Sequence, residues 1–165
     1  MITSQQSRLN GWIKTADSPA FRQKSLDIAM VIVRLALAWI FIYYGAWKLF
    51  GWFHGAGLNA TATFFATTAH LHPGKLFAVL SGVTEFGGGI ALAIGFLGRL
   101  AALGLLFDMV IAMLTVTFQN GLIGNSSGVG YGLNVALAAL CAAVILLGTG
   151  RYSLGARLHT RRLAS

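Results

Sequence analysis

Long apolar segments constrain this chain more than any other feature of its sequence. A helix needs roughly 20 apolar residues to cross the hydrocarbon core of a bilayer, and every backbone polar group must then be satisfied internally. We therefore predict an all-α integral membrane protein, an antiparallel bundle of four transmembrane helices. The expected spans cover residues 28–50, 76–97, 100–118 and 132–148, of which the last is a little short.

The composition and charge agree with a membrane protein of one domain. Charged residues make up only 10% of the 165 residues, less than half of the roughly 25% typical of soluble proteins. The net charge of +8 lies in two tails and not on a continuous face, which argues against nucleic acid as a partner. We predict a membrane domain over residues 28–150 between two basic tails, 1–27 and 151–165, of which the first is expected to be disordered.

The distribution of basic residues predicts the orientation. Four Lys and Arg residues precede the first span, four follow the last, and Arg99 lies in the turn between the second and third spans. The loops on the opposite side hold Lys75 alone. The positive-inside rule therefore places both termini in the cytoplasm. Residues 1–27 lack a cleavable signal peptide, so the first span should act as an uncleaved anchor.

The two outer loops differ in character. Residues 51–75 should include a short interfacial helix with Leu58, Phe64 and Phe65 on one face. Residues 119–131 are rich in Gly, Asn and Ser and predict a flexible turn. His70 and His72 have no third ligand at diagnostic spacing, so we predict no metal site.

Three ionisable side chains lie deep in the predicted spans: Arg34, Glu85 and Asp108. Each costs about 2.5 to 3.5 kcal/mol at the centre of a bilayer, which makes an intramembrane charge a candidate functional group. At about 1.5 Å per residue their depths are roughly 9, 18 and 12 Å from the cytoplasmic end, close enough for one site.

Small residues share the helix faces of both acids. Glu85 lies at helical spacing from Ser81, Gly82, Gly88 and Gly89, and Asp108 from Ala101, Gly104, Ala112 and Thr115. Small residues allow close helix contacts in lipid, so both carboxyl groups should face the bundle interior.

We expect Arg34 to pair with Asp108, Glu85 or both, with Asp108 nearer in depth. Glu85 would then lack a basic partner and hold a proton. The alternative is that the charges only fix helix register. Lys48 near the outer interface is expected to be an anchor that reaches toward the headgroups. Candidate pocket-lining residues are Trp39, Tyr43, Tyr44 and Asn134, although core packing explains the tyrosines equally well.

Several segments also resemble the DoxX family of bacterial four-helix membrane proteins. The similarity runs from about residue 30 to 155 through IFIYYGAWKLFGW, LSGVTEFGGGIALAIGFLGRLAALGLLFDM and GYGLNVALAALCAAVILLGTGRYSLG. It includes the positions Arg34, Lys48, Glu85, Asp108 and Asn134. The resemblance implies a bacterial inner-membrane protein related to the membrane subunit of a thiosulfate:quinone oxidoreductase.

Two functional hypotheses follow. In the first, the chain is a subunit of a quinone-linked redox system, with the cluster of Arg34, Asp108 and Glu85 as its catalytic site and quinone as its candidate cofactor. Electrons must then come from a redox partner protein, because the sequence has one cysteine, Cys141, and no haem or dinucleotide motif. In the second, the chain is a non-enzymatic anchor, an assembly subunit or a small-solute carrier. Its other expected partners are the lipid bilayer and a second copy of the chain.

Overall fold

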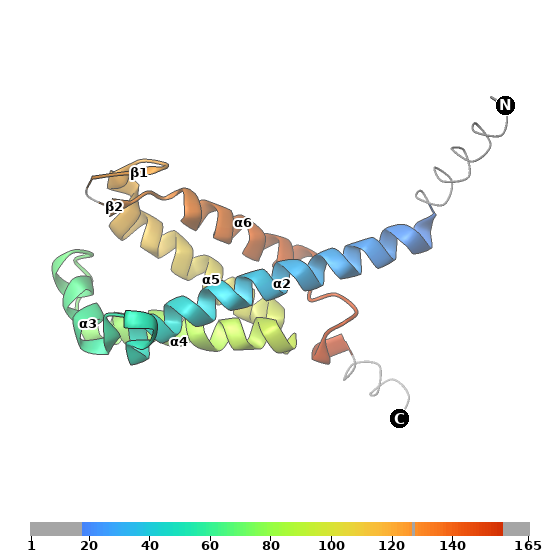
Figure 1. The fold of residues 1–165 in the computed structure, drawn as a ribbon, viewed down its shortest axis with the longest axis horizontal. Helices are drawn as coiled ribbons and strands as arrows, with labels where there is room; N and C mark the ends of the chain where they lie inside the picture. The colour runs from blue at the N-terminus through green and yellow to red at the C-terminus, as the bar shows by residue number, and fades with distance from the viewer. Residues whose placement is uncertain (1–17, 127, 157–165) are drawn as a thin grey trace.

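The structure, a computed structural model, describes residues 18–126 and 128–156, which form an almost entirely helical chain (Figure 1). The longest helices are α2 (Pro19–Phe50), α4 (Gly74–Ile94), α5 (Gly98–Ala112) and α6 (Gly132–Leu147). The shorter elements are η1 (Trp52–His54), α3 (Gly57–Thr67), η2 (Met113–Thr117), η3 (Phe118–Asn120), β1 (Gly124–Asn125) and β2 (Gly128–Val129).

Residues that favour a helix boundary lie at both ends of α2. The Ser18 hydroxyl accepts a hydrogen bond from the Phe21 amide at 3.3 Å, and Pro19 occupies the first helical position, where its missing N–H costs nothing. Gly51 ends the helix at φ 69°, a left-handed conformation that glycine adopts without strain. Residues 19–27 are therefore helical, which corrects the predicted disordered tail, while residues 1–17 lie outside the described part of the chain.

Within the described residues, three helical segments are long and apolar enough to cross a membrane. They are α2, α4 and the continuous stretch Gly98–Asn120 that joins α5, η2 and η3. Helix α6 has 16 residues, fewer than the roughly 20 that a span requires. The fourth span and the cytoplasmic location of the termini therefore stay predictions.

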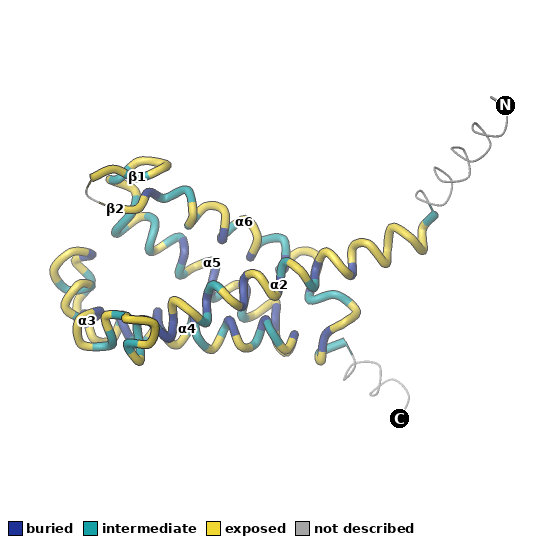
Figure 2. Tube along the Cα trace, in the orientation of Figure 1, coloured by how far each residue is buried: buried dark blue, intermediate teal, exposed yellow. Residues whose placement is uncertain are grey.

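The helices form two layers that diverge toward the end of the molecule where α3 and the β1–β2 hairpin lie (Figure 1). Helices α2, α3 and α4 pack together in one layer, α5 and α6 form the other, and α4 also packs along α5. Figure 2 shows the buried residues on the facing sides of these helices, around a core that includes Leu37, Phe41, Leu92, Leu105 and Val144.

Glycine permits the close contact between α2 and α4. A Cβ atom on Gly89 would lie 2.8 Å from Ile42 Cγ1 and 2.9 Å from the Ile42 amide nitrogen. A Cβ on Gly82 would lie 2.6 Å from the side chain of Leu49. The small-residue face predicted for Glu85 is therefore a helix contact, as the sequence indicated.

Both outer loops contain regular secondary structure. The expected short helix in residues 51–75 is α3, which packs on α4 through a contact of Gly74 with Ala62 and Ala66. The segment predicted as a flexible turn contains the antiparallel pair β1–β2, with Gly124 opposite Val129.

Two glycines of α4, two positions apart, offer a matched test of the α2–α4 contact. Gly89→Ala should lower the free energy of unfolding by about 1 to 3 kcal/mol, because the added methyl group meets the α2 backbone. Gly87→Ala is the control, since a Cβ there meets nothing within 4 Å and alanine is the better helix former. Detergent-micelle unfolding curves measure both, and equal stabilities of the two variants would contradict the described packing.

Candidate functional site

An ion pair joins α2 to α4 at the diverging end of the bundle. Lys48 Nζ lies 2.9 Å from Glu85 Oε1 and donates a second hydrogen bond to Ser81 Oγ, also at 2.9 Å. The Glu85 side chain is only 3% exposed and that of Lys48 16%. The ammonium group also lies 5.9 Å from the centre of the Phe65 ring, so an aromatic face covers its remaining side.

A second carboxyl group completes this cluster. Asp108 on α5 lies near Glu85, close enough for the two acidic groups to influence each other electrostatically. One oxygen of each acid, Glu85 Oε2 and Asp108 Oδ2, is buried and has no hydrogen-bond donor among the described residues. A single proton held between the two carboxyl groups would give both oxygens a partner, because a protonated carboxyl donates where a carboxylate only accepts. The cluster of Lys48, Glu85 and Asp108 is therefore suited to holding and transferring one proton.

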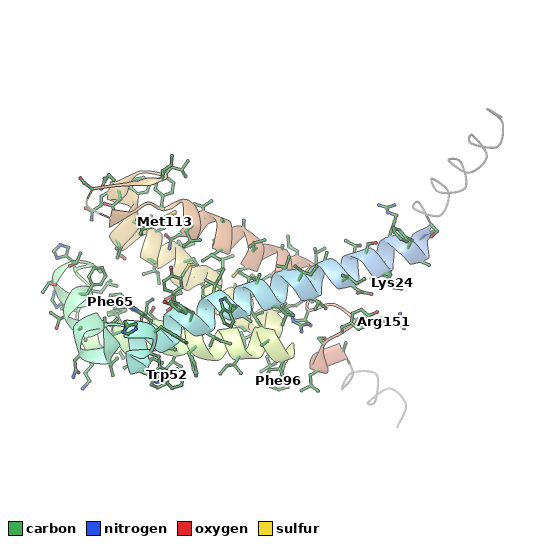
Figure 3. All side chains as sticks on the ribbon, in the orientation of Figure 1. Lys24, Trp52, Phe65, Phe96, Met113 and Arg151 are labelled. Carbon is green, nitrogen blue, oxygen red and sulfur yellow. The ribbon has the colours of Figure 1, made fainter. Side chains whose placement is uncertain are left out.

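The acid cluster borders a cavity of about 480 Å³, which lies between α3, α4 and α5. Lys48, Ser81 and Asp108 supply polar groups on its wall, and most of the remaining wall is apolar or aromatic. Figure 3 labels Phe65 on α3, which is part of this wall, and Met113 at the start of η2, next in sequence to the wall residue Ala112. The apolar wall includes Phe64, Phe65, Leu71, Phe77, Leu80, Phe107 and Ile111. Such a combination is typical of a site for a small, largely apolar ligand with a polar head.

A π-helical turn shapes the outer end of this cavity. The segment η2 interrupts the α-helical pattern of α5, and Thr115, Val116 and Thr117 from it line the cavity wall. Single π turns are frequent at functional sites because the extra residue re-aims the side chains that follow. Thr117 also borders a second cavity of about 480 Å³, whose wall includes the polar residues Thr68, Gln119 and Asn120.

Asn134 of α6 lies behind that wall and does not line either cavity. Its Oδ1 accepts a hydrogen bond from Thr117 Oγ1 at 3.1 Å, and its Nδ2 lies 3.7 Å from Met109 Sδ. Asn134 therefore does not line the pocket as predicted, but it hydrogen-bonds to Thr117, which does.

The predicted pairing of Arg34 with an acid is wrong. Arg34 donates to the carbonyl oxygens of Leu92 at 2.7 Å, Ala93 at 3.2 Å and Thr149 at 2.6 Å. Leu92 follows Glu85 by seven residues, or about 10 Å along α4, so the guanidinium lies two turns away from the acid. Arg34 instead binds carbonyl oxygens in the last turn of α4 and just beyond the end of α6.

Lys48 is the member of this cluster that the sequence interpretation missed. The expected interfacial anchor is in fact the basic partner of Glu85, so Glu85 is not the unpaired acid that was predicted. The sequence did contain a sign that Lys48 faces the bundle. Successive members of the set Arg34, Phe41, Gly45 and Lys48 are seven, four and three residues apart. Such spacings place residues on one helix face, and the other members of this set are buried.

The aromatic candidates of α2 lie away from the cluster. Trp39 is 76% exposed, and Tyr44 is exposed as well. Tyr43 stacks on Phe53 with ring centroids 4.7 Å apart. Because the opposite face of α2 packs on α4, these side chains point outward, and none of them lines the two cavities. The aromatic wall expected from the α2 side chains is instead supplied by Phe64, Phe65, Phe77 and Phe107.

Comparison with known proteins gives one match. A family model described as DoxX matches residues 29–118, more than half of the 165 residues. The matched range includes Arg34, Lys48, Glu85 and Asp108. No curated protein and no solved structure matches the chain.

Removing the basic member of the cluster should destabilise the protein strongly. Lys48→Met leaves Glu85 buried without its cation, which should cost about 3 to 5 kcal/mol in the free energy of unfolding. The loss should shrink as the pH falls, because protonation removes the unpaired charge. The double variant Lys48→Met/Glu85→Gln should recover most of the stability, and the exposed Lys75→Met is the matched control. A single variant as stable as the wild type would contradict a buried pair.

Arg34→Lys tests the other buried cation. A lysine cannot direct donors to three carbonyl oxygens as the planar guanidinium does, so the segment after α6 should open more often. We expect cleavage by trypsin after the exposed Arg151 to accelerate about tenfold. Mass spectrometry of the fragments measures this rate, with Arg22→Lys as a control at an exposed site. An unchanged rate would show that Arg34 does not hold the segment in place.

Proposed function

The chain belongs to the DoxX family and is a membrane protein, and from this membership and the geometry of the acid cluster we propose that it is a membrane subunit of a quinone-linked redox system of the thiosulfate:quinone oxidoreductase type. The proposal includes a four-span bundle in the bacterial inner membrane with both termini in the cytoplasm. Its site is the cluster of Lys48, Glu85 and Asp108, in place of the predicted cluster with Arg34.

One observation supports this proposal above the others. Asp108, which is half-buried, and Lys48, which pairs with the buried Glu85, border an apolar cavity of about 480 Å³, within the range of roughly 300 to 1,000 Å³ usual for small-ligand sites. Two buried carboxyl oxygens without donors would be costly in a purely structural cluster. If the cluster binds and releases a proton, both oxygens take part in holding that proton.

The chemistry assigns a distinct task to each residue. Reduction of a quinone to a quinol takes up two electrons and two protons. Asp108 on the cavity wall would give the proton that it shares with Glu85 to a quinone oxygen, and the pair would then take up a new proton from water, while the electrons arrive from the partner protein. When both acids are ionised, the ammonium group of Lys48 would compensate one of the two negative charges. A second passage of a proton through the pair completes the reaction.

The electrons must come from a partner protein. Cys141 is the single cysteine of the sequence and is fully buried in α6, so this chain has no dithiol of its own. We propose that a redox partner oxidises the donor, thiosulfate in this type of enzyme, and passes the electrons to the quinone in the membrane subunit.

Carboxamide variants test the proton-transfer role. Glu85→Gln and Asp108→Asn keep the size of each side chain but cannot carry the proton, so each should lower the rate of quinol formation by about 100-fold or more. Asp27→Asn is the matched control, because Asp27 is a buried carboxylate at the other end of α2. The rate is measured by quinone absorbance in membrane vesicles that contain the protein and its partner, with thiosulfate as donor, at equal protein abundance.

The outcome also separates the two functional hypotheses. Full activity in both carboxamide variants would overturn the proton-transfer role. A wild-type protein that neither retains nor reduces quinone, but co-purifies with an intact enzyme, would favour the anchoring or assembly function.

A further inference from the structure

The cavity beside Asp108 begins where α4 and α5 part. Near their connecting turn the two helices touch, with a Cβ on Gly88 placed 3.1 Å from Leu105 and a Cβ on Gly104 placed 3.3 Å from Thr84. Beyond this contact the cavity takes up the space between them, with walls from Phe77 to Thr84 on α4 and from Gly104 to Ala112 on α5. The two facing helices are therefore not sealed against each other at this end.

Three residues form the rim between this cavity and the outer surface of the two helices. Leu80, Phe107 and Ile111 line the cavity and are at the same time 52%, 57% and 46% exposed. All three are apolar, and both helices are long enough to cross the membrane. The surface on which the rim opens is thus the hydrocarbon-facing surface of the protein.

The other sides of the cavity are closed by side chains, unlike the side between α4 and α5. Helix α3 covers the outer end with Phe64 and Phe65, and the Lys48–Glu85 pair closes the side toward α2. The second cavity, which shares Phe64 and Thr117 with the first, has a more polar wall. Among the sides formed by the described residues, the α4–α5 side combines a wholly apolar rim with exposure on membrane-crossing helices.

We propose that the cavity opens sideways into the membrane between α4 and α5, and that the hydrocarbon tail of a ligand with a polar head occupies this opening. The apolar rim offers no partner to a charged solute, whereas a tail passing over Leu80, Phe107 and Ile111 stays in apolar surroundings throughout. The polar head then lies against Asp108 and Lys48. The identity of the head as a quinone rests on the proposed function, but the opening itself does not.

Photolabelling from the membrane tests the opening. The full chain is reconstituted in phosphatidylcholine vesicles that contain a lipid with a diazirine on its acyl chain, and labelled residues are located by mass spectrometry after illumination. We expect label on Thr84 and Ala112 inside the cavity. Ile111→Trp should reduce that label about tenfold, because the larger side chain fills the rim. Leu100→Trp is the matched control, an exposed position on the same helix outside the cavity wall.

The occupant is tested in the same vesicles with two quinones of equal head group. A decyl-tailed benzoquinone should displace the internal label, and the tail-less benzoquinone should not. Internal label that decreases in Ile111→Trp supports the opening even if neither quinone competes, a result that would reject the quinone as ligand and with it the proposed function. Absence of internal label, or label unaffected by Ile111→Trp, would overturn the opening whatever the carboxamide variants show.

Discussion

The close contact between α2 and α4 is the constraint on which the rest of this structure depends. Glycines let the two backbones approach, and that approach brings Lys48 to within 2.9 Å of Glu85. An ammonium group or a carboxylate alone at this depth would be costly, so the ion pair and the helix contact require each other. The pair also fixes the offset of α2 along α4, since a shift of one turn would separate the charges by about 5.4 Å.

One face of α2 carries the buried cation Arg34 and the half-buried cation Lys48, and the fold satisfies them in different ways. Arg34 has a planar group with donors in several directions, which matches carbonyl oxygens near the ends of α4 and α6. Lys48 presents a compact charge and binds one carboxylate and one hydroxyl. As a result, Arg34 holds the closed end of the bundle together without using an acid. Both intramembrane carboxyl groups remain available for the site at the diverging end.

The divergence of the two helical layers gives that site its chemical character. Where α4 and α5 touch, leucine and threonine side chains fill the contact with glycine. Where they part, Asp108 borders a cavity and the π turn of η2 contributes the next part of its wall. The same geometry therefore supplies an acid pair, an apolar cavity and an apolar rim between α4 and α5, features that a tightly sealed bundle would lack.

The sequence by itself determined the helical class, three of the membrane-crossing segments, the short helix α3 and the small-residue faces around Glu85 and Asp108. Apolar length and helical periodicity are local properties, so they can be recognised without knowing any neighbour. Only the tertiary structure decided that Lys48 and not Arg34 meets Glu85, that Arg34 binds carbonyl oxygens, and that Trp39 and Tyr43 face outward. The partner of a buried charge depends on how far two helices are rotated and offset against each other. That relation is set by packing between residues distant in the chain, which depth along a single helix does not reveal.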